Sequence, residues 1–529
     1  MSRPCFNANL ALLVVMAAVL ALPVGKVRAG GGRLQLTVVD EVTGEPVACR
    51  IHLKDARGRP HRPRDRQIPF WHDHFVIPGQ VTLNLPRGNY AFDLERGPEY
   101  RTRHGRFTIN DFADDAKQVT LQRCVDMAAE RWFSGDLDIR RRPDRIELLM
   151  QADDLHVAPV VTWGTDIDPP RRLPPEGPVN CFQPGWCWST RAGLISRAGT
   201  ELLLFGLEEP ISLPKGGNGE YPPTIKYLLA KPAGDSDGGA AAPASNAGAS
   251  GPWIDIAHAN SWDLPLLVAH GLVDSIEVAN GRIGRESIVM KPAVGKPRDG
   301  ALYPGPRGYA RWIQDIYFRL LECGLRIPPS AGSGSGVQPN PLGYNRVYVH
   351  VDSVFSLEAW WANFRRGRVT VTNGPLLRPT VEGHLPGHVF QMAEGDRLSL
   401  EVGLTLSTRE PISYLEIIQN GRAVHSLPFE EYAKSGRLPL VEFDEPGWFL
   451  VRVITDLPNT HRFAMTAPWY VEVEGQRRVS REAAQFFLDW VYERARTIDL
   501  TGPRRDAVID YHRAARDFWQ RLVDRANAE

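Results

Sequence analysis

Apolar and polar residues alternate along the chain from about residue 33 to residue 125, as at Leu34, Leu36 and Val38. A period of two places every second side chain on one face of a β-strand. Turn residues such as Thr43 and Gly44 separate successive alternating segments. We therefore expect a small β-sandwich over residues 33–125.

The same alternation returns after residue 373. It covers Leu398, Leu400, Val402, Leu404 and Leu406, and the Asn-Gly pair at 420–421 is a strong hairpin signal. These features predict an immunoglobulin-like β-sandwich over residues 373–473. Apolar residues at helical spacing then predict two C-terminal helices within residues 480–529.

Residues 132–350 have a different pattern, in which short apolar runs alternate with helical stripes. Pro143 suits a first helical turn, and Leu148, Leu149, Ala152 and Leu155 form a stripe behind it. The apolar run at 157–162 then suits a strand buried on both faces. The region predicts an α/β fold, a distorted (β/α) barrel whose site lies at the carboxyl ends of its strands.

Residues 1–29 combine Arg3, an apolar run and small residues after Lys26, which is typical of a cleaved secretory signal peptide. The expected location is secreted or periplasmic, with no transmembrane segment after cleavage. Residues 231–252 lack apolar anchors and predict a disordered loop inside the barrel. Lys+Arg and Asp+Glu both number 62, so nothing indicates a nucleic-acid partner. The sequence sets no oligomeric state.

Cysteine usage leaves two alternatives open. Cys181 and Cys187 flank a turn and can close a small disulfide loop, or both can remain buried thiols. The other cysteines after residue 29 are Cys49, Cys124 and Cys323, and none has Cys-x-x-Cys spacing.

Several short motifs within residues 132–375 resemble those of the PHP (polymerase and histidinol phosphatase) superfamily, specifically its exported CehA/McbA-like metallohydrolases. Residues 135–140 read Gly-Asp-Leu-Asp-Ile-Arg, and residues 370–375 read Thr-Val-Thr-Asn-Gly-Pro. The family begins with Gly-Asp-Leu-His-x-His and ends with Thr-Asn-Gly-Pro. The resemblance implies a PHP-like barrel, and the flanking N-terminal sandwich is similar to carboxypeptidase-regulatory or transthyretin-like modules.

The resemblance also implies that most of the family's metal ligands are replaced here. Asp138 and Arg140 stand where two histidines are usual, Trp163 stands in the Thr-Asp-His motif, and glycines replace an Asp and a His around Ser333 and Ser335. Arg140 cannot bind a metal, because a guanidinium is always charged and offers no lone pair. It can neutralise Asp138, or it can hold an anionic substrate.

The segments at 254–260 and 274–280 also resemble strand ends of the family, although the Thr-Asn-Gly-Pro ending is the most specific motif. His258 is the retained imidazole, and Glu277 and Asn280 are expected at the same mouth. Trp163 can stack on a sugar ring or fill the space of a lost ion. We expect the mouth of the barrel to be aromatic and basic, lined by Arg140 and by Trp163, Trp186, Trp188 and Trp262.

A further histidine pair, His72 and His74, flanks Asp73 in the N-terminal sandwich. Alternate spacing places both rings on one face of a strand, as in a metal pair. No third ligand lies nearby in the sequence, so loop solvation or an edge contact is the favoured interpretation.

These observations give three hypotheses. The first is a non-catalytic barrel that binds a small molecule, a carbohydrate or polyol, through Arg140, Trp163, Asn280, Ser333 and Ser335, with no cofactor. The second is an active ester or phosphoester hydrolase with a rebuilt site. The third is a structural cell-surface interaction protein.

In the second hypothesis, Asp136, Asp138, His258 and Glu277 carry acid/base chemistry without metal, or a single divalent metal is held with Asp138 and His258 as its ligands.

Overall fold

The computed structural model describes residues 30–165, 177–197, 199–207, 211, 253–289, 295–455 and 457–529. The predicted signal peptide at 1–29 and the predicted loop at 231–252 lie outside these residues. None of the helices in the described ranges has both the length and the apolar character that a membrane span requires.

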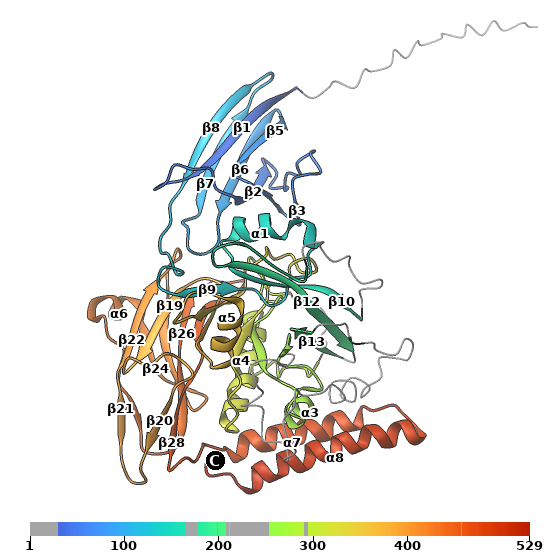
Figure 1. The fold of residues 1–529 in the computed structure, drawn as a ribbon, viewed down its shortest axis with the longest axis vertical. Coiled ribbons are helices and arrows are strands. Elements are labelled where there is room, and N and C mark those ends of the chain that lie inside the picture. Colours follow the sequence, from blue (N-terminus) through green and yellow to red (C-terminus); the bar gives the residue numbers. More distant parts are fainter. Residues whose placement is uncertain are drawn as a thin grey trace, which may run out of the picture.

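The N-terminal part is a β-sandwich of two sheets, as the alternation predicts, and it forms one end of the molecule (Figure 1). One sheet has the order β5-β1-β8 and the other β3-β4-β2-β6-β7. Leu34, Ile51 and Phe75 belong to the buried core that both sheets share. The strands are β1 Gly31–Asp40, β2 Cys49–Asp55, β3 Phe70–Trp71, β4 His74–Ile77, β5 Gln80–Pro86, β6 Gly88–Glu95, β7 Arg103–Ile109 and β8 Asp114–Leu121.

A mixed sheet forms the centre of the molecule, in the order β16-β15-β14-β13-β12-β10-β9-β17-β18. Its strands are β9 Trp132–Gly135, β10 Val157–Gly164, β12 Trp186–Arg197, β13 Thr200–Phe205, β14 Trp253–Ile256, β15 Ser275–Ala279, β16 Pro329–Ala331, β17 Arg346–His350 and β18 Val369–Thr372. Strand β11, Val179–Gln183, pairs with β12, and a disulfide joins Cys181 to Cys187 across that pair.

The segment after β9 makes this sheet curve back on itself. Leu137 N–H donates to the Ala331 carbonyl at 3.0 Å, and Arg140 N–H donates to the Ser335 carbonyl at 2.8 Å. On the other side, Val161 N–H donates to the Ile139 carbonyl at 2.9 Å. Residues 137–140 therefore link β10 to the chain that follows β16.

The central helices are α1 Ile146–Asp153, α3 Leu264–Ala269, α4 Arg307–Glu322 and α5 Leu357–Arg365. In α4, the apolar stripe that includes Ile316 and Leu320 is buried, and Gly324 with φ of 73° follows the helix end. Regular strand-helix alternation does not extend through the region, because β12 and β13 follow one another as an antiparallel pair. The described residues are mostly β-sheet with few helices.

The C-terminal part is again a β-sandwich, and its main sheet continues from the centre through the pairing of β18 with β27. The predicted strand over 398–406 is two strands, since β21 pairs with β25 and β22 with β19. Asn420 and Gly421, with φ of 48° and 75°, form the predicted hairpin turn.

The strands of this part are β19 Leu376–Val381, β20 Val389–Met392, β21 Leu398–Leu400, β22 Val402–Ser407, β23 Tyr414–Gln419, β24 Arg422–Pro428, β25 Val441–Phe443, β26 Gly447–Thr455, β27 Arg462–Thr466 and β28 Trp469–Val473, with helix α6 at Phe429–Ser435.

The two predicted terminal helices, α7 Arg481–Arg496 and α8 Gly502–Asp524, run side by side at the end of the molecule opposite the N-terminal sandwich (Figure 1). They pack against the central part: the Trp519 indole donates to the Pro265 carbonyl at 2.8 Å, and Arg494 pairs with Asp263 at 2.8 Å.

Candidate functional site

The segment after β9 brings the predicted site residues together. Asp136 and Asp138 lie on this segment, while Glu277 lies in β15. Gly332, just after β16, separates two of these acids: a Cβ added there would lie 2.2 Å from Glu277 Oε1 and 2.5 Å from Asp138 Cβ. Glycine is needed at 332 because these two side chains approach its backbone so closely.

Asp136 is fully buried and is held by donors from other segments. It accepts hydrogen bonds from Ser333 N–H at 2.8 Å and from Gly343 N–H at 2.7 Å, and the Ser333 hydroxyl donates to its Oδ2. Burial nevertheless raises the pKa of Asp136 to about 7, since the hydrogen bonds oppose only part of the desolvation. Asp136 acts as a structural anchor for the glycine-rich segment after β16.

Arg140 occupies the acidic side of this site. Its Nε donates to Asp138 Oδ1 at 2.7 Å and its Nη2 to Asp138 Oδ2 at 2.9 Å. The same Nη2 donates to Glu201 Oε2 at 2.9 Å. Burial lowers the pKa of Arg140, but Asp138 and Glu201 more than offset this effect and raise it above its ordinary value. The ion pair is bidentate, because Arg140 donates to both carboxylate oxygens of Asp138.

His258 also approaches Glu201, with its Nε2 3.6 Å from Glu201 Oε2, the oxygen that accepts from Arg140. Burial lowers the pKa of His258 to about 4, so the ring is neutral at physiological pH. The side chains of Arg140, Glu201 and His258 are 12%, 20% and 11% exposed. They form a connected row that solvent reaches, with Glu201 at its centre.

Two further buried acids lie behind this row. Both carboxylate oxygens of Glu277 lack a hydrogen-bond partner. Burial, followed by the negative charges of Asp138 and Asp255, raises the pKa of Glu277 well above its ordinary value. Asp255 accepts a hydrogen bond from the Ser275 hydroxyl, and burial raises the pKa of Asp255 to about 7. Burial therefore shifts both acids toward their protonated forms.

Of the other predicted ligand-binding residues, Asn280 and Ser333 use their side chains in hydrogen bonds to neighbouring residues. Asn280 donates to the Tyr309 hydroxyl at 3.0 Å and accepts from Arg282 N–H at 3.1 Å. Ser333 holds Asp136, whereas the Ser335 hydroxyl is buried without a partner. Ser335 therefore contributes its carbonyl to the sheet and leaves its hydroxyl unused.

The tryptophans lie in packed regions. Trp163 is 6% exposed and its ring covers Gly193, where an added Cβ would lie 2.1 Å from the indole. Trp188 is buried and donates to Glu147 in α1 at 3.2 Å, with Trp186 packed near it. Trp262 lies against the main core, with Lys296 Nζ 5.8 Å from its ring centre. The Trp163 ring is therefore packed against the neighbouring strand β12.

The metal centre that the resemblance implies does not fit these residues. The guanidinium of Arg140 uses both oxygens of Asp138, and His258 is directed at Glu201. Among the described residues, the group of His, Cys, Asp or Glu side chains whose ligand atoms all lie within 4.8 Å of one another is His52, Asp73 and His74, in the N-terminal sandwich. Asp138 and His258 do not form such a group.

Sequence reasoning did not select Glu201 or Asp255. Each is the acidic residue of an otherwise mostly apolar strand, Thr-Glu-Leu-Leu-Leu-Phe in β13 and Trp-Ile-Asp-Ile in β14. An ionisable side chain in a buried strand is itself a signal, because burying a charge is costly unless it is paired or protonated.

No family model and no curated protein matches the chain. Among solved structures, GBS52, the minor pilin of the Gram-positive pathogen Streptococcus agalactiae, is 18% identical over 18% of this chain, with a TM-score of 0.16. The matched part spans 46% of the pilin. The N-terminal four Ig domains of Dscam1 isoform 4.4 are 10% identical over 84% of this chain and 100% of theirs, with a TM-score of 0.13. At these scores neither likeness bears on the fold or function of this chain.

Proposed function

We propose that this protein is an exported PHP-like barrel of the CehA/McbA-like type in which Arg140 has taken the place of the metal, and that it binds a small carbohydrate or polyol without turnover. The disulfide between Cys181 and Cys187 suits an oxidising compartment. The observation that carries the proposal is the two-pronged contact of Arg140 with Asp138.

An arginine in this position supplies the positive charge of a metal ion but not the catalytic chemistry of a metal ion. It neutralises Asp138 and reaches Glu201, and it has no open coordination position at which water could be activated. A site organised in this way keeps its buried carboxylate stable without a metal.

The row of Arg140, Glu201 and His258, whose side chains are 11–20% exposed, supports a polyol ligand. Neighbouring hydroxyl groups both donate and accept, so one hydroxyl can donate to Glu201 while the next accepts from Arg140. The two partners are already paired at 2.9 Å, so binding requires no uncompensated charge to be buried.

One observation favours the alternative of an active hydrolase. Glu277 is buried, has no hydrogen-bond partner and has a raised pKa. These properties are found in general acids. In this alternative, water attacks the ester or phosphoester, neutral His258 accepts a proton from that water, and Glu277 donates a proton to the leaving group as its bond breaks, while Asp136 and Asp138 keep their positions.

A thermal-shift screen with monosaccharides, disaccharides and polyols tests the proposal, using wild type, Glu201→Gln and the exposed control Arg142→Ala. At a ligand concentration about 100 times Kd, we expect a stabilisation of about 2.7 kcal/mol in wild type and in the control, and a much smaller one in Glu201→Gln. Absence of any shift, or an equal shift in Glu201→Gln, contradicts the proposal. Ester or phosphoester turnover that Glu277→Gln abolishes supports the alternative instead.

A further inference from the structure

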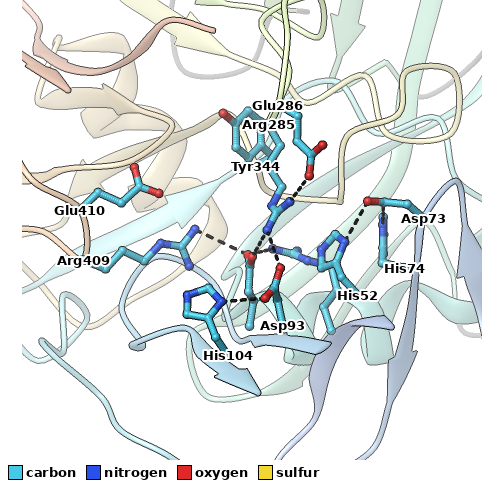
Figure 2. A network of polar contacts seen from close by, with 12 residues as sticks. His52, Asp73, His74, Asp93, His104, Arg285, Glu286, Tyr344, Arg409 and Glu410 are labelled. Carbon is cyan, nitrogen blue, oxygen red and sulfur yellow. Dashed lines mark hydrogen bonds and ion pairs between the residues drawn. The ribbon is translucent and has the colours of Figure 1, made fainter. Parts of the chain in front are cut away.

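The N-terminal sandwich holds a second group of ionisable side chains, far from the central site in the sequence. His52 lies in β2, and Asp73 and His74 lie at the hairpin between β3 and β4. Strands β2 and β4 are hydrogen-bonded neighbours, with Ile51 opposite Phe75. The sequence contains no third ligand near Asp73 and His74, and the fold supplies His52 from the adjacent strand. Figure 2 shows both rings directed at the Asp73 carboxylate.

The distances in this group match those between ligands of one metal ion. His52 Nδ1 lies 3.1 Å from Asp73 Oδ2, and His74 Nδ1 lies 3.1 Å from Asp73 Oδ1. One potential ligand atom from each of the three residues lies within 4.8 Å of the other two. Two ligands of a tetrahedral zinc ion, each bonded at about 2.0–2.1 Å, are roughly 3.3 Å apart.

The charges around Asp73 leave room for a cation. Within the described residues, its ion-pair partners are the imidazoles of His52, His72 and His74. Two nearby arginines are paired with other acids: Arg50 with Glu95 and Asp153, and Arg285 with Glu95 and Glu286.

The exposures of the three side chains suit a built site with an entrance. His52 and His74 are 1% and 3% exposed, whereas Asp73 is 16% exposed. Burying a polar ring is unfavourable unless it is used. His52 makes its side-chain hydrogen bond to Asp73, and its Nε2 has no partner.

We propose that His52, Asp73 and His74 bind one divalent transition-metal ion of the zinc class, with water completing the coordination on the exposed side of Asp73. Imidazole and carboxylate ligands suit zinc and its first-row neighbours. The ion ties β2 to the β3–β4 hairpin, and it lies in a part of the protein distinct from the central site.

The test uses the full chain, stripped with a chelator and titrated with Zn²⁺, and with Co²⁺ for visible absorption. Wild type is expected to bind about one ion per chain, raising its Tm and giving the absorption of a Co²⁺ site with nitrogen ligands. Asp73→Asn and His52→Ala are expected to weaken Zn²⁺ binding by more than about 100-fold.

The control is His104→Ala, since His104 is exposed, belongs to the same polar network and contacts Asp93 rather than Asp73 (Figure 2). Circular dichroism in chelator checks that each variant is folded. Failure of wild type to bind Zn²⁺, or unchanged binding in folded Asp73→Asn, overturns the proposal. Zinc bound in His52→Ala but lost in Asp138→Asn instead contradicts the function proposed for the central site, so the two failures are distinguishable.

Discussion

Arg140 holds Asp138 through two hydrogen bonds, from Nε to Oδ1 at 2.7 Å and from Nη2 to Oδ2 at 2.9 Å. The two residues are separated by a single position in the chain, at the sites where the resembling family has its paired histidines. The pair gives Asp138 a positively charged partner, and Arg140 Nη2 also donates to Glu201 Oε2 at 2.9 Å.

Removing the Arg140 side chain should destabilise the folded protein. Arg140→Ala leaves Asp138 buried without its partner, and we expect a loss of about 3 kcal/mol in the free energy of unfolding. Urea unfolding measures this loss. Arg142→Ala is the matched control, because the Arg142 side chain is 83% exposed, and a change below about 0.5 kcal/mol is expected. Equal effects of the two substitutions would show that the pair does not stabilise the fold.

The raised pKa of Glu277 predicts a pH-dependent effect of Glu277→Gln. A buried acid with a raised pKa favours the folded state below its unfolded pKa of about 4.3, and this stabilisation is lost as pH rises toward the folded pKa. The variant should therefore gain stability relative to wild type by about 1 kcal/mol per pH unit above pH 5. Urea unfolding at several pH values measures this gain.

The exposed control Glu401→Gln should show no such trend with pH. A constant difference between Glu277→Gln and wild type across this range would mean that Glu277 is ionised in the folded protein.

Packing of Trp163 over Gly193 predicts that Gly193→Ala is destabilising. The added Cβ would lie 2.1 Å from the indole, and overpacking of this kind costs about 1–3 kcal/mol. Thermal unfolding tests it against Gly300→Ala, where a Cβ meets no atom within 4 Å. If Trp163 instead moves out to bind a ligand, Gly193→Ala will be tolerated and will alter ligand affinity.

The disulfide across the β11–β12 pair should stabilise the protein modestly. It closes a loop with a sequence separation of 6, for which chain entropy predicts about 2 kcal/mol. We expect Cys181→Ser to lower Tm and to remove the effect of reducing agent on Tm. Cys124→Ser changes an exposed free cysteine and should leave both unchanged. A reducing agent that acts equally on Cys181→Ser would contradict this assignment.

Local patterns predicted much of the fold. Alternation located some strands of both sandwiches, such as β1 and the segment of β21 and β22, and the Asn420-Gly421 pair located a hairpin that the structure contains. The split between Leu400 and Val402 was not predicted, because alternation continues through it while the pairing partners change from β25 to β19. The antiparallel pairing of β12 with β13 was also not predicted, because the relative direction of two strands depends on how they pair in the fold.

The two candidate sites were harder to predict from the sequence than the strands were. The pairing of Arg140 with Asp138 was one of two predicted interpretations, whereas Glu201, which lies 61 residues from Arg140, becomes its partner only in the fold. Similarly, His52 and Asp73 are 21 residues apart and meet because β2 pairs with β4. Contacts between neighbouring strands depend on the register of their pairing, which a single sequence does not reveal.

The central claim is that Arg140 replaces the metal ion at the central site, and metal content tests it most directly. The variants His52→Ala and His52→Ala/Asp138→Asn are expressed with added zinc, manganese and iron, and the metal in each is measured by elemental analysis. The substitution at His52 removes the N-terminal group, so any remaining ion reports on the central site. We predict less than about a tenth of an ion per chain in both variants. An ion bound stoichiometrically in His52→Ala and lost with Asp138→Asn would contradict the replacement of the metal by Arg140.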